Sequence, residues 1–375
     1  MRPVHAFAAA GAAVLSLSTL TACGGSDKKG GTNAGVVSIT STDKACEISK
    51  KDLPAGKTVF KITNKGDTVT EVYVYAPGDK IVTERENIGP GTGVELTAEL
   101  VAGKYQIACK PGMKGNGIRQ DIAVTGQATG ATDTRLTQAV TDYRAYIATQ
   151  VDDTLAKSQK FAASVKKGDI AGAKALYAPS RLGWESIEPV AEAFGDIDPK
   201  VDLREKDLEK GQEWSGWHRL EKALWVKGSA KGEEKYADQL IKDLQDLKAK
   251  VPSAVITPTS MANGAKELLD EVATGKVTGE EEAFSHTDLV DFKGNVDGAQ
   301  KVFELLKPVV QEKDTDLSKT LDEEFAKIEV LLKKYEKGDG YVSYTSLSKT
   351  QVKELGDGVN ALGEPLSKLA GTVAK

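Results

Sequence analysis

The residues with the clearest potential for chemistry lie in the segment 216–225, where a histidine and a glutamate stand three positions apart. The segment has helical periodicity, and on a helix His218 and Glu221 lie one turn apart on the same face. At about 100° per residue, Glu221 falls within the apolar arc formed by the surrounding tryptophans and leucine. A carboxylate directed at a core costs free energy unless a partner compensates its charge. The sequence therefore predicts that Glu221 pairs with a metal ion, an arginine or a shared proton.

More acidic residues occur in the same half of the chain. Glu185 and Glu188 are spaced i and i+3, which places them on one face of a helix, and a run of glutamates at 280–282 precedes His286. Any one of these acids alone is explained as a solvated charge. Pairs of acids at helical spacing, together with a histidine beside tryptophans, favour a metal site.

The β-rich part of the chain, residues 36–125, contains two cysteines, Cys46 and Cys109, and no histidine. A type 1 copper centre needs two histidines beside its cysteine, so this class of site is excluded within that part. A disulfide is one interpretation, and it is reasonable outside the cytoplasm. The alternative is a metal site of thiolates and nearby carboxylates such as Glu71, Glu84 and Glu86. Both interpretations remain open from the residues alone.

Two kinds of element must position these residues. Short β-rich runs separated by turn residues predict a β-sandwich over 36–125; they are 36–39, 58–62, 71–75, 93–100, 105–108 and 118–124. A linker at 126–133 is rich in small residues. Long amphipathic segments then predict a helical bundle over 134–375; the clearest are 134–166, 213–227, 238–250, 299–311 and 321–335. The predicted fold is thus two domains, an all-β sandwich followed by an all-α bundle.

The N-terminus reads as a targeting segment. Arg2 is followed by an apolar stretch over 6–20 and then by Leu20-Thr21-Ala22-Cys23, which resembles a bacterial lipoprotein signal peptide. The prediction is a signal peptide at 1–22, lipidation of Cys23 and a flexible tether at 23–35. An ordinary secretory signal is the alternative. The mature chain would be anchored to the outer face of the cell membrane.

Composition excludes other classes of protein. The 375 residues are 28% charged and 40% hydrophobic, with a net charge of −5 and no basic stripe. This argues against a nucleic acid partner. No apolar run after the N-terminus reaches the roughly 18–20 residues needed to cross a bilayer.

Several long blocks of the chain resemble the EfeO family of iron-uptake components, which join a cupredoxin-like Greek-key sandwich to an imelysin-like helical domain with an HxxE motif. The blocks are 46–47, 84–88, 103–109, 181–189, 194–199, 216–225 and 285–289. The resemblance implies a metal site in the helical domain, with Glu280 as an alternative for its last member: His218, Glu221, Glu185, Glu188, Asp202 and Glu281. In the sandwich it implies a second site on five residues: Cys46, Glu71, Glu84, Glu86 and Cys109.

The resemblance also implies a function. The protein would capture iron outside the cytoplasm and deliver it to a membrane permease, with a heme peroxidase as a further partner and no enzymatic activity of its own. A site of carboxylates and one imidazole suits iron, with copper or zinc as alternative ions. One alternative function is an imelysin-like metallopeptidase, although a zincin needs a second histidine on the same helix. The other is an envelope protein that binds an anionic polymer, which would require a basic groove that the sequence does not display.

Overall fold

The computed structural model describes residues 35–127 and 133–375, which belong to one compact unit. The predicted signal peptide, the lipidated Cys23, the tether up to residue 34 and the centre of the predicted linker lie outside these residues. Among the described helices, none combines the length and the apolar character needed to cross a membrane.

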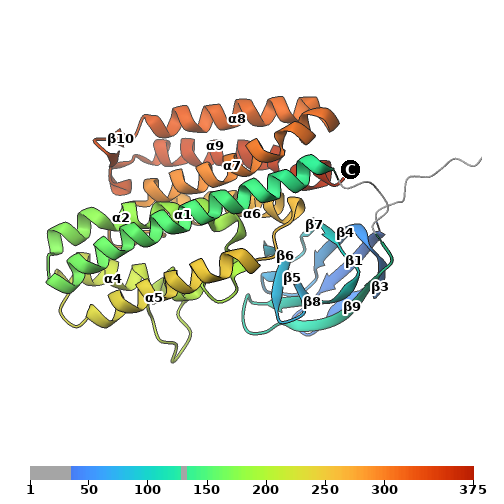
Figure 1. Cartoon of the computed structure of the whole chain (residues 1–375), viewed down its shortest axis with the longest axis horizontal. Helices are drawn as coiled ribbons and strands as arrows, with labels where there is room; N and C mark the ends of the chain where they lie inside the picture. Colours follow the sequence, from blue (N-terminus) through green and yellow to red (C-terminus); the bar gives the residue numbers. More distant parts are fainter. Residues whose placement is uncertain (1–34, 128–132) are drawn as a thin grey trace, which may run out of the picture. The chain divides into compact units, whose positions relative to one another are not determined.

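The N-terminal part is a sandwich of two sheets (Figure 1), which confirms the predicted all-β class. One sheet has the order β2-β1-β4-β7, with strands Cys46–Ile48, Gly35–Ser41, Gly56–Asn64 and Gly93–Leu100. The other has the order β3-β9-β8-β5-β6, with strands Asp52–Pro54, Ile118–Thr125, Gly103–Pro111, Thr70–Ala76 and Lys80–Ile88. Alternate residues point inward, because successive side chains of a strand face opposite sides of its sheet. Val37, Phe60, Val72 and Ile107 contribute to the core between the sheets.

Strand β6 was not among the predicted strands, since its sequence is interrupted by charged and polar residues. These residues contact helix α6 (Pro258–Thr274) of the helical part. Arg85 Nη2 donates to Asp270 Oδ2 at 2.8 Å, and Asn263 Nδ2 donates to Thr83 Oγ1 at 3.0 Å. The polar strand is therefore covered by partners of the helical domain, which a search for alternating apolar residues cannot detect.

The C-terminal part is a helical bundle (Figure 1), as predicted, with one small β-hairpin. Its longer helices are α1 (Thr134–Lys167), α2 (Ile170–Ile187), α5 (Glu234–Lys250), α6, α7 (Asp288–Lys313), α8 (Thr315–Lys333) and α9 (Lys349–Leu366). Its shorter elements are the helices α3 (Asp198–Val201), α4 (Trp217–Lys222) and α10 (Leu369–Val373), a π-helical turn Ala223–Lys227, 3₁₀ segments that include Glu188–Phe194 and Lys276–Thr278, and the hairpin of β10 (Glu336–Lys337) and β11 (Gly340–Tyr341).

Helices α2 and α7 pack closely at the centre of the bundle. A Cβ atom added to Gly294 would lie 2.6 Å from the Cβ of Glu185, and one added to Gly298 would lie 2.3 Å from the carbonyl oxygen of Ser186. Only glycine fits at such separations. The close approach brings polar side chains of both helices into one buried cluster.

Helix α4 begins at another close approach. Gly216 has a φ of 84°, and a Cβ there would lie 2.2 Å from the carbonyl oxygen of Val201. A glycine is favoured by the positive φ and required by the contact. This contact holds the start of α4 against the end of α3, and thereby sets His218 beside Asp202.

Candidate metal centre

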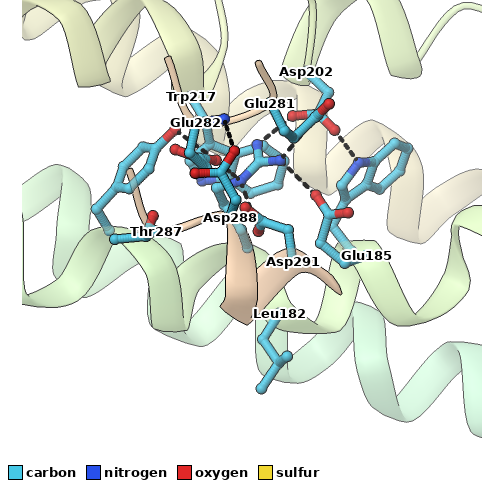
Figure 2. Close-up of polar contacts among 12 residues, drawn as sticks. Leu182, Glu185, Asp202, Trp217, Glu281, Glu282, Thr287, Asp288 and Asp291 are labelled. Carbon is cyan, nitrogen blue, oxygen red and sulfur yellow. Dashed lines mark hydrogen bonds and ion pairs between the residues drawn. The ribbon is translucent and has the colours of Figure 1, made fainter. Parts of the chain in front are cut away.

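A cluster of buried charged side chains lies in the middle of the helical bundle. Its members come from α2, α4, α7, the residue that follows α3 and the loop before α7, and each is less than a tenth exposed: Arg181, Glu185, Asp202, His218, Glu221, Glu281, Glu282 and Asp291. Figure 2 shows Glu185, Asp202, Glu281, Glu282 and Asp291 converging from these separate elements. A buried charge of this kind persists only when partners compensate it.

The imidazole of His218 has carboxylates on both sides. Its Nε2 lies 3.2 Å from Asp202 Oδ1 and 3.7 Å from Glu281 Oε1, while its Nδ1 lies 3.3 Å from Glu221 Oε2. Two triads of potential ligands result, each with its ligand atoms within 4.8 Å of one another: Asp202–His218–Glu281 and His218–Glu221–Glu282. Both triads share the His218 ring, with Asp202 and Glu281 at Nε2 and Glu221 at Nδ1.

Glu221 is fully buried, as its place in the apolar arc predicted. Its Oε1 accepts hydrogen bonds from the backbone N–H groups of Phe284 at 2.9 Å and Ser285 at 2.6 Å, while its Oε2 faces His218. Burial acts to raise the pKa of Glu221, but His218 and the Ser285 N–H outweigh burial and lower the pKa below its ordinary value. The carboxylate therefore stays ionised and holds the loop before α7 against α4.

Arg181 supplies the largest share of positive charge to the cluster. Its guanidinium is fully buried and pairs with Asp202 and Glu185, and its Nε lies 2.7 Å from Glu282 Oε1 and 3.3 Å from Asp291 Oδ1. Arg181 was not among the residues predicted for the site. Its position four residues before Glu185, on the same buried face of α2, is the signal that could have identified it.

Two of the predicted metal ligands, Glu185 and Glu188, form ion pairs with a lysine. Glu185 Oε2 and Glu188 Oε2 lie 2.9 Å and 2.7 Å from Lys276 Nζ, and both accept hydrogen bonds from Asn295 Nδ2. Neither glutamate belongs to a described group of potential metal ligands. An ammonium group occupies the position between them that a metal ion would need, because Lys276 is itself 3% exposed and directed at the pair.

The three glutamates at 280–282, before α7, have different partners. Glu281 faces His218 and also accepts from Arg204 Nη1 at 2.9 Å, whereas Glu280 is exposed and pairs with Lys206. Glu282 accepts hydrogen bonds from Ser285 Oγ at 2.8 Å and Tyr177 Oη at 3.2 Å. Of the two alternatives, Glu281 is therefore the one beside the histidine.

Charge within the cluster is distributed unevenly. Burial acts to raise the pKa of Asp202, but Arg181 and His218 lower it well below its ordinary value, and Glu281 is lowered in the same direction. The pKa of His218 is raised because its three carboxylate neighbours outweigh burial and the charge of Arg181. Burial raises the pKa of Glu282 to about 8. A metal ion at the histidine would thus meet ionised carboxylates on the Nε2 side and displace a proton from the ring.

A cavity of about 340 Å³ distinguishes the two triads. Asp202 and Glu281 line it, whereas Glu221 and Glu282 are not among its lining residues. His218 Nε2 is buried and makes no hydrogen bond with the described residues. The Asp202–His218–Glu281 triad is therefore the one that borders a space through which an ion could arrive.

The predicted second site in the sandwich is contradicted for its two cysteines. Cys46 and Cys109 form a disulfide, so they offer no thiolate to a metal. Both lie in the core between the sheets, where Cys109 is opposite Val72. The adjacent residues Glu71 and Tyr73 of β5 face the other side of the sheet, because the side-chain period of a strand is two. The five residues predicted for this site therefore cannot converge on one ion.

The acids of that predicted site are divided between two contacts. Glu71 Oε2 lies 3.7 Å from Lys110 Nζ, also on the outer face. On β6, Glu84 is the register partner of Tyr73 of β5. The hydroxyl of Tyr73 donates to Glu86 Oε1 at 2.9 Å. Glu84 and Glu86 line the same cavity as Asp202 and Glu281, together with residues of the helical domain.

Comparison with known proteins agrees with both halves of this structure. Residues 139–369 match the Imelysin family and residues 8–121 match the Cupredoxin-like domain family. The chain is 39% identical over 342 residues to the iron uptake system component EfeO of Escherichia coli O1:K1 / APEC, and 38% identical to those of Escherichia coli strain K12 and Shigella flexneri. Each alignment covers 90% of this chain and 91% of the relative.

A solved structure is similar in fold. It is the crystal structure of a protein from Parabacteroides distasonis ATCC 8503 described as an iron-regulated protein A precursor, with a TM-score of 0.52 and 15% identity, covering 65% of this chain and 97% of that one. The extent and identity of the EfeO matches, together with the sandwich and the imelysin bundle, determine the assignment. The chain belongs to the EfeO family of iron uptake system components.

Proposed function

We propose that this protein captures iron outside the cytoplasm at the Asp202–His218–Glu281 triad and delivers it to a membrane permease of the same uptake system. The observation that carries the proposal is the state of His218 Nε2, which is buried, makes no hydrogen bond with the described residues and faces two ionised carboxylates beside a cavity. The names of the relatives, which are iron uptake components, support the choice of ion.

The remaining contacts of His218 suit a metal-binding role. When Glu221 accepts a hydrogen bond from Nδ1–H and Nε2 is deprotonated, the lone pair of Nε2 is directed at Asp202 and Glu281, which is the usual arrangement of a carboxylate, a histidine and a metal. Two carboxylates and one imidazole form a hard, oxygen-rich ligand set that suits iron, with zinc or copper as competing ions. In this proposal Glu221 positions the ring, and Glu185 and Glu188 act through Arg181 and Lys276.

The same contacts disfavour a peptidase. A zinc peptidase needs a second histidine ligand and a carboxylate free to act as general base. Within the described ranges no second histidine joins either triad, and Glu221 is occupied by two backbone N–H groups and the ring. We therefore propose a binding role. Metal-dependent cleavage of casein by the purified chain would contradict it.

Location and partners complete the proposal. Lipidation of Cys23 would anchor the protein to the outer face of the cell membrane, where a permease can receive the ion. A heme peroxidase of the same system is the second expected partner. Neither triad contains a group that would itself change the oxidation state of iron.

The test compares two neighbouring glutamates with different surroundings. Glu281→Gln removes a charge beside His218, whereas Glu280→Gln removes an exposed charge from the same loop. Anaerobic Fe(II) titration of the full mature chain should show affinity reduced by at least about 100-fold for Glu281→Gln, since even outer partners of a ligand contribute 10–100-fold. Glu280→Gln should bind as the unmodified chain does. Equal affinities for both variants would refute the assignment.

A further inference from the structure

One carboxylate of the proposed iron site is shared between the histidine and an arginine. Glu281 Oε1 lies 3.7 Å from His218 Nε2, while Glu281 Oε2 accepts a hydrogen bond from Arg204 Nη1 at 2.9 Å. Glu281 and Arg204 both line the cavity that borders the site. The two oxygens of this carboxylate therefore have different neighbours, an imidazole on one side and a permanent cation on the other.

Arg204 differs in exposure from the other arginine of the site. Arg181 pairs with Asp202, lies 3.8 Å from Glu281 Oε1 and is fully buried. The side chain of Arg204 is 33% exposed. Among the described residues, no further lysine or arginine forms an ion pair with Asp202 or Glu281. Arg204 is therefore the one permanent cation of the site that can move into solvent without a rearrangement of the buried cluster.

The position of Arg204 in the chain allows this movement. It precedes the 3₁₀ turn Glu205–Asp207, whose three residues are exposed, and its Nε donates to Asp207 Oδ2 at 2.8 Å. Two residues before it, Asp202 accepts hydrogen bonds from two buried side chains. The guanidinium can thus exchange Glu281 for water while the neighbouring ligand stays in place.

Arg204 remains charged in both positions. Burial acts to lower its pKa, but Glu281 and Asp207 outweigh burial and raise the pKa above its ordinary value. An iron ion beside Glu281 would bring two positive charges close to the guanidinium, and like charges at such short separations repel. The ion and Arg204 therefore compete for the same carboxylate.

The strength of this competition follows from the contact that the ion would replace. The hydrogen bond between Arg204 and Glu281 joins two charged groups, and a bond of this class changes an equilibrium constant by about tenfold or more. An ion that binds must offset the loss of this bond. When the ion leaves, the bond forms again and favours the empty site.

From this geometry we propose that Arg204 is a positioning residue for iron release, which moves away from Glu281 when the ion binds and returns to Glu281 as the ion leaves. The inference rests on the proposed function, since it requires Glu281 to be an iron ligand. The returning guanidinium supplies the positive charge that Glu281 loses with the ion. Arg204 therefore weakens the binding of iron and speeds its release, which suits a protein that passes the ion on.

The experiment measures release of Fe(II) from the full mature chain to an excess of a chromophoric chelator, by stopped-flow absorbance under anaerobic conditions. Equilibrium titration of the same samples gives the affinity. Arg204→Gln removes the charge, and Arg204→Lys keeps it. The matched control is Lys206→Gln, which removes a positive charge two residues further along the same segment, where it pairs with the exposed Glu280.

Arg204→Gln should bind Fe(II) about tenfold more tightly and release it about tenfold more slowly, the equivalent of one charged hydrogen bond. Lys206→Gln should match the unmodified chain, and Arg204→Lys should restore most of the release rate. A purely structural role for Arg204 would instead give weaker binding and faster release.

Three results would each overturn the proposal. They are release from Arg204→Gln that is as fast as from the unmodified chain or faster, an equal slowing in Lys206→Gln, and release from Arg204→Lys that is as slow as from Arg204→Gln. Because Arg204 is a third exposed, both of its variants should remain folded, which thermal unfolding of the metal-free chain verifies.

Glu281→Gln separates this inference from the proposed function. If Glu281→Gln binds iron as tightly as the unmodified chain, the proposed site and the role of Arg204 both fail. If Glu281→Gln loses affinity while Arg204→Gln changes neither affinity nor release, only the role of Arg204 fails.

Discussion

Replacement of His218 by asparagine tests the centre of the proposed iron site. The variant removes the imidazole that lies beside Asp202 and Glu281 and keeps a small polar side chain at the same buried position. His286 provides the control, since it is the other histidine in the described part of the chain and belongs to no group of potential ligands. It has a φ of 59°, and asparagine tolerates this conformation better than alanine does.

The expected magnitude follows from linkage between binding and folding. A metal ion at 100 times its dissociation constant stabilises the folded state by about 2.7 kcal/mol. The helical domain has roughly 240 residues, and at ~2.1 cal/mol/K per residue its unfolding entropy is about 0.5 kcal/mol/K. The metal should therefore raise the melting temperature of this domain by about 5 °C. A loss of about 100-fold in affinity for His218→Asn leaves a metal-induced stabilisation of about 0.4 kcal/mol, or about 1 °C.

The metal-induced shift, rather than the melting temperature itself, is the informative quantity. Without metal, His218→Asn should already be less stable, because three carboxylates lose their imidazolium partner. The pKa of His218 is raised in the folded protein. The stability that its positive charge contributes is therefore fully present below the unfolded pKa of about 6.5, and it is lost as pH rises through the folded pKa. Without metal, the difference in stability between the unmodified chain and His218→Asn should thus be largest at mildly acidic pH.

The assay is differential scanning calorimetry of the mature chain with and without Fe(II), under anaerobic conditions at constant free metal. The shift of about 5 °C should persist in His286→Asn and fall to about 1 °C in His218→Asn. A full shift in His218→Asn, or its loss in His286→Asn, would refute the assignment of the iron ligand.

Three further outcomes are expected. Replacing both Cys46 and Cys109 by alanine opens a loop closed over a separation of 63 residues, so the free energy of unfolding should fall by about 4 kcal/mol in chemical denaturation. Bound iron should be unchanged, and a loss of iron would restore the cysteines as ligands. Lys276→Met leaves the buried Glu185 without its ammonium partner and should cost about 3–5 kcal/mol at neutral pH; a cost below about 1 kcal/mol would contradict the ion-pair role. Burial and the charge of Asp202 raise the pKa of Asp198 to about 7, so apo stability should fall as pH rises from about 4 to 7, and this fall should be smaller in Asp198→Asn. An identical pH profile in that variant, measured by thermal unfolding, would exclude Asp198 as the cause.

The sequence predicted the elements whose apolar residues follow a regular period. The six predicted strands all lie within observed strands, and the predicted helix at 134–166 corresponds to α1. Strand β6 was missed because polar residues interrupt its sequence, and two of them, Thr83 and Arg85, are paired with helix α6 rather than with solvent. Helices α6 and α9 were not among the predicted helices, since glycines and polar residues interrupt their apolar faces.

The residues of the candidate site were likewise predicted only in part. The placement of Glu221 in an apolar arc was visible from helical spacing, and His218 lies beside it as expected. The internal cations Arg181 and Lys276 were missed: the only sequence signal for Arg181 is its spacing of four residues from Glu185, and Lys276 lies in a 3₁₀ segment too short to show a periodicity. Their discovery requires tertiary contacts, because only the approach of α2 to α7 and the loop before α7 shows which acids each cation neutralises.

Within the buried cluster of the helical bundle, the two internal cations leave one position for a metal, beside His218. Arg181 and Lys276 are held in place by buried carboxylates and stay charged at any physiological pH, so they fix the geometry of the cluster permanently. His218 differs, because its charge can be exchanged: a metal ion that replaces the ring proton adds positive charge where Asp202 and Glu281 are both ionised. The same exchange runs backward when protons become abundant, since protons compete with the metal for the imidazole and then for the carboxylates. If the proposed site binds iron, its one exchangeable ligand beside a fixed framework would let the ion enter without rearrangement of the bundle and leave when the histidine is protonated, as the proposed carrier function requires.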